Sequence, residues 1–163
     1  MRRPLALSLL LLLAASPARA DETPDRAAPT EDAADRRAEA RALFESGVAH
    51  FDRGEWSAAL ADFLRSRELY PTKAATKNAA VCLRKEGRFD EALETFESLL
   101  RDFPDLAPQD RAFATKEIAE LRGAVGSIDI ASAEPGAAIV IDGRARGEYP
   151  TPGPLRVAAG RRR

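Results

Sequence analysis

Few residues of this chain are suited to chemistry. The 163 residues contain one histidine, His50, and one cysteine, Cys82. A metal site or a base-activated nucleophile needs several such side chains, so one residue of each type argues against both. We therefore expect no catalytic site, no metal site and no cofactor. We interpret His50 as a half-buried structural residue and Cys82, which lies among Ala79, Ala80 and Leu83, as an inert buried thiol.

The remaining polar residues give no catalytic pattern either. Asp and Glu are plentiful, with 26 in the chain, and those of the predicted helices lie on solvent-facing sides, at spacings typical of surface ion pairs rather than of an acid and base pair. No glycine-rich phosphate loop is present, because Gly123 and Gly126 follow a predicted helix and precede a strand, the reverse of the order in a nucleotide site. The sequence therefore predicts a protein that is not an enzyme.

The first twenty residues have the features of a secretory signal peptide. "MRRPLALSLLLLLAASPARA" has two arginines, an apolar run over 5–15, and the small-x-small tripeptide 18–20. The apolar run is shorter than the roughly 20 residues that span a bilayer, and no cysteine stands at the cleavage point, so we expect neither an integral membrane anchor nor a lipoprotein. Cleavage before Asp21 would leave 22 basic and 26 acidic residues. We expect an exported protein, periplasmic or extracellular, that binds no nucleic acid.

The segments after residue 20 differ in their apolar periodicity. Residues 21–38 carry acids, prolines and alanines with no large apolar side chain, and we predict a flexible lead-in. Apolar residues at helical spacing then predict helices over 39–53, 57–69, 73–85, 90–101 and 108–122. From residue 126 onward the pattern alternates, as in strands, and Asp142-Gly143 is a strong hairpin turn signal.

One ten-residue pattern occurs twice, 33 residues apart: "GEWSAALADF" from Gly54 and "GRFDEALETF" from Gly87. The two glycines would end helices at positive φ, and Ala59 and Ala92 are small where paired helices would cross. The pattern resembles the tetratricopeptide repeat over roughly residues 40–104, although the spacing is one short of the family's period of about 34 residues. The resemblance implies a mainly α fold, with two helical hairpins and a capping helix over 39–124.

The last segment resembles another family, the PEGA domain, a small β module of surface and envelope proteins. "SIDIASAEPGAAIVIDG", the later Thr151-Pro152 and the "AAG" before the last strand keep that family's order. The resemblance implies a β domain over 126–163. The family continues for at least one more strand, so we expect a partial domain in which "AIVID" lies at or near an open sheet edge.

The tetratricopeptide resemblance also implies a binding groove, because the first helix of each repeat lines the concave side of such arrays. It assigns eight candidate partner-binding residues, apolar at one end and basic at the other: Phe44, Val48, Phe51, Lys77, Asn78, Val81, Arg84 and Lys85. Such a groove suits a segment with an apolar side chain and an acidic group. A second interpretation is that the lead-in or the fifth helix covers the apolar residues and that the basic ones are ordinary solvated charges.

Two functions follow from these expectations. The first is an exported, non-catalytic interaction module that binds a protein or peptide of the cell envelope through the groove. The alternative is a structural adaptor, in which the β part attaches to a cell-wall or surface polymer and the helices act as a spacer.

Overall fold

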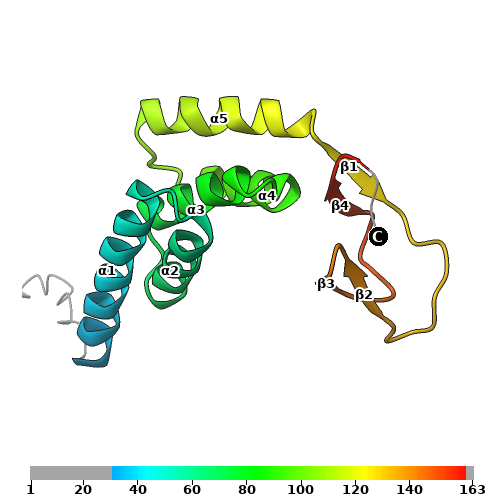
Figure 1. Ribbon diagram of the computed structural model, residues 1–163, viewed down its shortest axis with the longest axis horizontal. Coiled ribbons are helices and arrows are strands. Elements are labelled where there is room, and N and C mark those ends of the chain that lie inside the picture. The colour runs from blue at the N-terminus through cyan, green and yellow to red at the C-terminus, as the bar shows by residue number, and fades with distance from the viewer. Residues whose placement is uncertain (1–30, 161–163) are drawn as a thin grey trace, which may run out of the picture.

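The computed structural model describes residues 31–160, and the predicted signal peptide and residues 21–30 of the predicted lead-in lie outside that range. Five helices precede four strands in the described residues (Figure 1). The elements are α1 (Glu31–Asp52), α2 (Trp56–Leu69), α3 (Lys73–Lys85), α4 (Phe89–Asp102), α5 (Pro108–Arg122), β1 (Val125–Ile128), β2 (Ala138–Ile141), β3 (Arg144–Glu148) and β4 (Leu155–Ala158). The prediction of a mainly α fold followed by a small β part is confirmed.

The first four helices form two hairpins, α1 with α2 and α3 with α4. Gly54 and Gly87 stand in the two turns with φ of 74° and 72°, in the left-handed region that glycine adopts without strain. The two turns make the same hydrogen bonds: the amide of Glu55 donates to the carbonyl of His50, and the amide of Arg88 donates to the carbonyl of Leu83. The repeated sequence pattern therefore gives a repeated structure, as predicted.

Small residues let the helices of each hairpin approach closely. Ala59 and Ala92 are fully buried, as are Phe63 and Phe96 four residues further along α2 and α4. A Cβ at Gly47 would lie 2.8 Å from Cε1 of Phe63, closer than two carbon atoms pack. The core of the array is continuous, because α3 lies between α2 and α4 and contributes Cys82 and three alanines with no exposed surface.

The predicted flexible lead-in is wrong for residues 31–38, which form the first two turns of α1. This segment is rich in alanine and arginine, which are among the best helix formers, and Glu31 and Asp32 stand in the first turn, where negative charge interacts favourably with the helix dipole. The α1 helix is therefore 22 residues long against 14 for its partner α2, so its N-terminal part extends past the end of α2.

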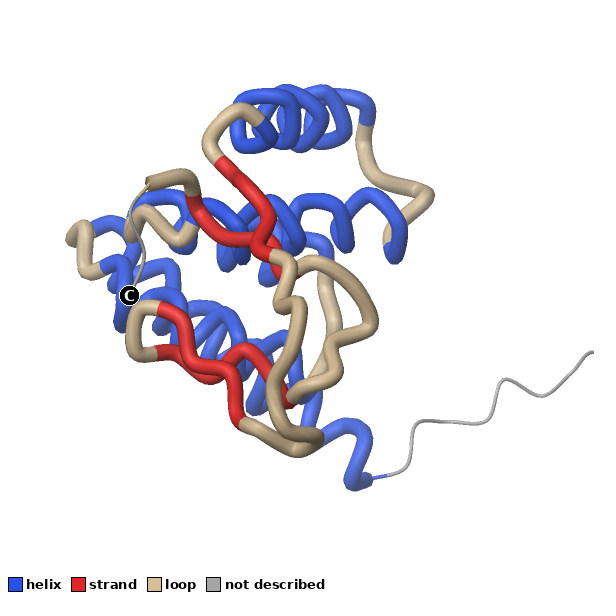
Figure 2. The backbone as a smooth tube through the Cα atoms, turned by 90° about the vertical axis from the view of Figure 1, so that its right-hand side faces the viewer, coloured by secondary structure: helices blue, strands red, loops and turns tan. Residues whose placement is uncertain are grey.

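The helix α5 packs along α4, and the chain then leaves the helical array after Gly123 and Ala124. The β part has two separate antiparallel pairs of strands (Figure 2). The pairs are β1 with β4 and β2 with β3, so in sequence the first pair encloses the second. Asp142 and Gly143 form the tight turn between β2 and β3, both at positive φ, as predicted. Each described strand has one partner, so β2 lies at a sheet edge.

No helix between residues 31 and 160 has the length and apolar character to cross a membrane.

Candidate partner-binding groove

A groove of about 910 Å³ lies where α1, α2 and α3 meet at the N-terminal end of the array. Its lining is mostly apolar, with two arginines on one side, and we call it the α1 groove. The lining residues are Ala33, Ala34, Arg37, Ala38, Ala40, Arg41, Phe44, Ser66, Tyr70, Thr72 and Ala74. The long α1 helix creates one wall of this groove, because seven of its residues line it.

Hydrogen bonds fix the three elements that surround the groove. The hydroxyl of Ser66 donates to the backbone carbonyl of Ala40 at 2.7 Å, which holds α2 against the middle of α1 in a buried position. Thr72 caps α3, since its side-chain oxygen accepts a hydrogen bond from the amide of Ala75. Pro71 precedes this cap and, with Tyr70 in extended conformation, turns the chain from α2 into α3. The floor of the groove is therefore held in place by the fold itself.

The electrostatics of the α1 groove favour an acidic group. The guanidinium of Arg37 lies 5.2 Å from the ring centroid of Tyr70, in a cation–π contact. Arg37 has no carboxylate partner among residues 31–160, whereas Arg41 pairs with Glu45 at 2.9 Å. An arginine oriented by an aromatic ring, beside an apolar surface, can bind a carboxylate without losing an existing ion pair.

The apolar residues that the sequence assigns to a groove lie partly in the core. Phe44 and Phe51 have ring centroids 5.5 and 6.4 Å from that of Phe63, and Val48 packs against the same cluster. All three are half-buried. Of the three, Phe44 alone lines the α1 groove.

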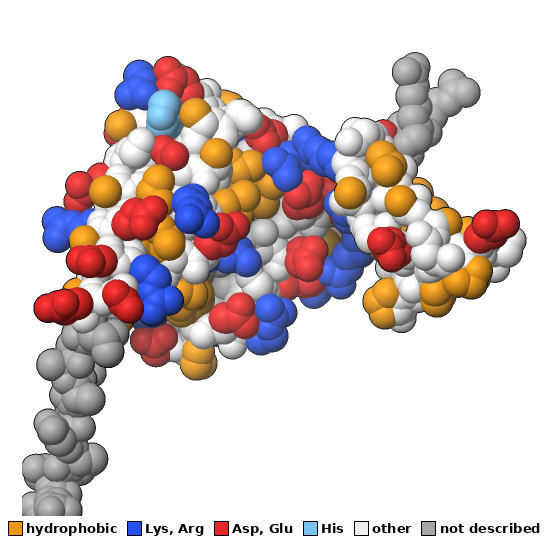
Figure 3. Space-filling model, turned by 90° about the horizontal axis from the view of Figure 1, so that it is seen from below, with side chains coloured by type: hydrophobic (Ala, Val, Ile, Leu, Met, Phe, Trp, Pro, Cys, Tyr) orange, Lys and Arg blue, Asp and Glu red, His pale blue; other side chains and the backbone are white. Residues whose placement is uncertain are grey.

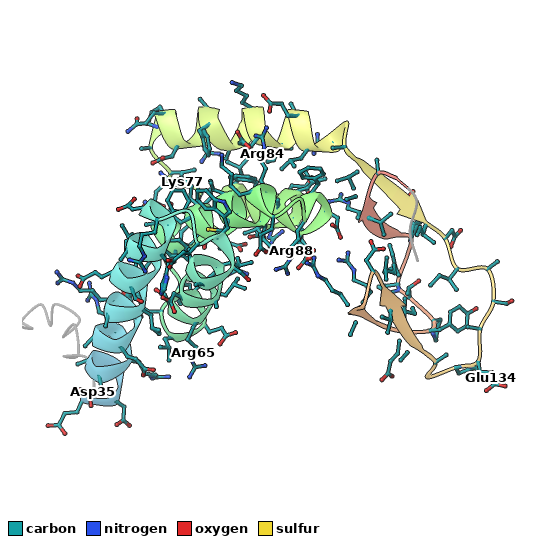
Figure 4. All side chains as sticks on the ribbon, in the orientation of Figure 1. Asp35, Arg65, Lys77, Arg84, Arg88 and Glu134 are labelled. Atoms are coloured by element: carbon teal, nitrogen blue, oxygen red, sulfur yellow. The ribbon has the colours of Figure 1, made fainter. Side chains whose placement is uncertain are left out.

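Two of the three predicted basic residues of α3, Lys77 and Arg84, form ion pairs with α5. Nζ of Lys77 lies 2.7 Å from a carboxylate oxygen of Asp110, and Arg84 pairs with both Glu117 and Glu120 (Figure 4). Lys85 lies 5.6 Å from the ring centroid of Trp56. The half-buried Asn78 and Val81 stand between these charges on α3, and the Asn78 side chain makes no hydrogen bond with any described residue. The α3 residues thus lie together, but separately from the α1 groove.

Sequence reasoning missed the N-terminal half of the site. Ala33, Ala34, Arg37 and Ala38 belong to the segment predicted to be flexible. The sequence signal that indicates helix in this segment is the run of good helix formers from residue 31. Helix propensity extends α1 there, although the segment has no large apolar residue.

The other reactive groups are structural. Nδ1 of His50 lies 2.5 Å from Oε2 of Glu55, and Arg53 also binds that carboxylate. Hydrogen bonds from Arg53 and His50 lower the pKa of Glu55 to about 2. Cys82 is fully buried, and desolvation together with the charge of Glu86 raises its pKa to about 11, so it is a poor nucleophile. No cluster of potential metal ligands exists within residues 31–160.

Comparison with protein families agrees with this architecture. The family model described as tetratricopeptide repeat matches residues 47–110. This segment is similar to a tetratricopeptide array. The match runs from the last turns of α1 through the first turn of α5, so it covers α2, α3 and α4 and leaves most of α1 and the β part outside. No curated protein matches the chain.

Tetratricopeptide repeats generally mediate protein–protein interaction, and they act as scaffolds rather than as catalysts. The array here has the physical features of such a scaffold. Its stacked hairpins share one core, and the reactive side chains described above are buried or paired. The family match therefore supports a role in protein–protein interaction.

Proposed function

We propose that this protein is an exported, non-catalytic interaction module that binds a protein segment of the cell envelope through its tetratricopeptide array. The observation that carries the proposal is the α1 groove, a hollow of about 910 Å³ on a scaffold of the type that binds other proteins. Ligand sites are typically concave and mostly apolar with a few polar groups, and this groove has that composition.

The chemistry of the groove defines the partner segment. The alanines Ala34 and Ala38 leave room for a backbone or an apolar side chain to approach α1. Arg37 then supplies the cation for an acidic group on the same segment. We propose a segment with an apolar anchor and a nearby Asp, Glu or terminal carboxylate. The α3 charges Lys77 and Arg84 contribute less to this binding than the sequence implies, because α5 neutralises them.

Export to the envelope rests on the N-terminal sequence, with its arginines, apolar run and small-x-small tripeptide. Intact-mass measurement of protein recovered from the exported fraction tests it. We expect a product that starts at Asp21. A product that retains residues 5–15 would mean a membrane anchor and would contradict export by cleavage.

A single substitution in the groove tests the binding site. Ala38→Glu places a charged side chain in the α1 groove and repels an acidic ligand, and the matched control Ala61→Glu makes the same change on an exposed position of α2 outside the groove. In affinity capture from an envelope extract with cross-linking, we expect the specific partner to be lost with Ala38→Glu and kept with Ala61→Glu. Capture that survives both substitutions contradicts a site in this groove.

The alternative function, a structural adaptor attached through the β part, is favoured by one observation. The β part exposes Val140 at 56 % on an edge strand and resembles a module of surface proteins. Deletion of residues 126–163 distinguishes the two functions. Loss of envelope retention with unchanged partner capture supports the adaptor, whereas loss of capture after Ala38→Glu in the full chain supports the groove.

A further inference from the structure

The β part contacts the helical array mainly through charged side chains. Arg146 of β3 lies 2.6 Å from Asp90, and its neighbour on the same strand, Arg144, lies 2.9 Å from Glu91. Arg156 of β4 lies 2.5 Å from Glu97. The three carboxylates all belong to α4, and acidic and basic side chains gather where the array meets the β part (Figure 3). We call these three pairs the α4 joint.

The Asp90–Arg146 pair is the least exposed pair of the α4 joint. The side chains of Asp90 and Arg146 retain 10 % and 19 % of their exposed surface, whereas those of Arg144 and Arg156 retain 49 % and 52 %. Arg146 also donates to the backbone carbonyl of Arg156 at 2.8 Å, which ties β3 to β4. This hydrogen bond joins the two strand pairs, and Arg146 therefore contacts both α4 and β4.

Apolar contacts at this interface are small. Val157 and Ala158 of β4 are buried beside the start of α4, and Val125 of β1 packs against the core of the array. None of these is a large side chain, so the area of apolar surface they remove from water is modest. The covalent connection between the array and the β part is short, because only Gly123 and Ala124 separate α5 from β1.

We propose that the α4 joint is a reversible ionic latch that holds the β part on the array at low ionic strength and releases it, as one body about Gly123–Ala124, when the charges are screened. Other charged groups face the same interface. Arg88 pairs with Glu86 and Glu91, Arg122 of α5 pairs with Glu97 at 3.1 Å, and Asp142 lies in the turn of the inner hairpin. The released form exposes an acidic row on α4 and a basic face on the β part. The array and the β part are then free to bind partners of opposite charge.

The test measures a distance across the joint in the full chain. Ala61→Cys on α2 and Val140→Cys on β2 supply two exposed label sites, and the native Cys82 is buried and does not compete for the label. We expect one narrow spin-label distance at low salt. At about 1 M salt, where the Debye length is about 3 Å, we expect a broad distribution while the circular dichroism of the helices is unchanged.

Charge variants at low salt separate the ionic latch from a merely fixed contact. Arg146→Glu should shift the ratio of docked to released forms by roughly tenfold toward release, because it leaves Asp90 facing a like charge. Adding Asp90→Arg to the same chain should restore the narrow distance. The matched control is Arg101→Glu, which disrupts an exposed pair with Asp102 on the same helix and should leave the distance unchanged.

Two results would overturn the proposal. One is a narrow distance that persists at high salt and in the Arg146→Glu variant, which would mean that apolar contacts hold the β part. The other is a broad distance in the unmodified chain at low salt, which would mean that the latch does not close.

Discussion

Arg84 of α3 forms an ion pair with Glu117 of α5, and the two residues are 33 positions apart, the period of the repeated sequence pattern. Lys77 and Asp110 form a second pair with the same separation. The two pairs therefore join equivalent positions of successive first helices. One repeat earlier, the same positions hold Phe51 and Phe44, which pack against Phe63 of α2 instead of forming ion pairs.

The Arg84–Glu117 pair should contribute to the stability of the array. Glu117 is buried, so Arg84→Ala leaves a carboxylate without its main partner, and we expect a loss of about 1–3 kcal/mol in the free energy of unfolding. Chemical denaturation followed by circular dichroism measures this. Exposed Lys116→Ala is the control, with an expected change within about 0.5 kcal/mol. Equal effects of the two substitutions would mean that the buried pair adds no stability.

The small residues of the two hairpins should be equally intolerant of larger side chains. Ala59→Leu and Ala92→Leu each force extra methylene groups into a fully buried helix crossing, and we expect a loss of about 1–3 kcal/mol for each. Exposed Glu94→Ala, on the opposite side of α4, should be nearly silent. Thermal melting of the three variants checks this, and similar midpoints for all three would contradict the close crossing.

Acid should weaken the α4 joint. The hydrogen bond from Arg88, with further attraction from Arg144 and Arg146, lowers the pKa of Glu91 below its ordinary value of 4.5. Burial raises the pKa of Glu97, but hydrogen bonds from Arg156 and Arg122 outweigh it and the net direction is down. Only the part of this lowering that comes from Arg144, Arg146 and Arg156 of the β part depends on docking, so that part stabilises the docked form above the ordinary pKa and is lost as the pH falls through the lowered values.

The distribution of label distances across the joint should therefore be narrow near neutral pH. It should broaden as the pH falls below about 4.5. Because acid also affects other carboxylates, Glu91→Gln with Glu97→Gln provides a matched test at neutral pH. This double variant should broaden the distance without acid. A narrow distance in the double variant would show that these two carboxylates do not hold the β part.

Cys82 should report on unfolding of the core. Its thiol is fully buried, and its pKa of about 11 keeps it protonated at neutral pH. We expect a thiol reagent to leave Cys82 unmodified in the native chain and to react with it once denaturant unfolds the array. A cysteine introduced at the exposed Ala61 gives the control rate. Fast modification of Cys82 under native conditions would mean that α3 opens easily.

The hairpins could be predicted from sequence because local signals and packing signals agree there. Gly54 and Gly87 end helices at positive φ, and Ala59 and Ala92 occupy the crossings, so one repeated pattern specified turn, helix and core together. The extent of α1 could not be predicted in this way. Its first two turns carry no large apolar residue, and their helical state depends on propensity and dipole effects that apolar periodicity does not register.

The candidate site was predictable only in part, since its electrostatics depend on contacts between distant segments. The tetratricopeptide resemblance assigns Phe44 to a groove, and Phe44 does line the α1 groove. Lys77 and Arg84 were identified as basic, but no local pattern shows that Asp110 and Glu117 neutralise them from a later helix. The pairing of Arg146 with Asp90, which are 56 positions apart, could not be predicted from the sequence either.

The nesting of β2 and β3 inside the β1–β4 pair also affects how the chain can fold during synthesis. Each helix packs mainly on its immediate neighbour, so the array can assemble helix by helix as the polypeptide emerges. The strand β1 must instead wait for β4, because Val125 pairs with Ala158. The acidic face of α4 is thus complete before its arginine partners are all synthesised, and in that interval it is open to other basic segments.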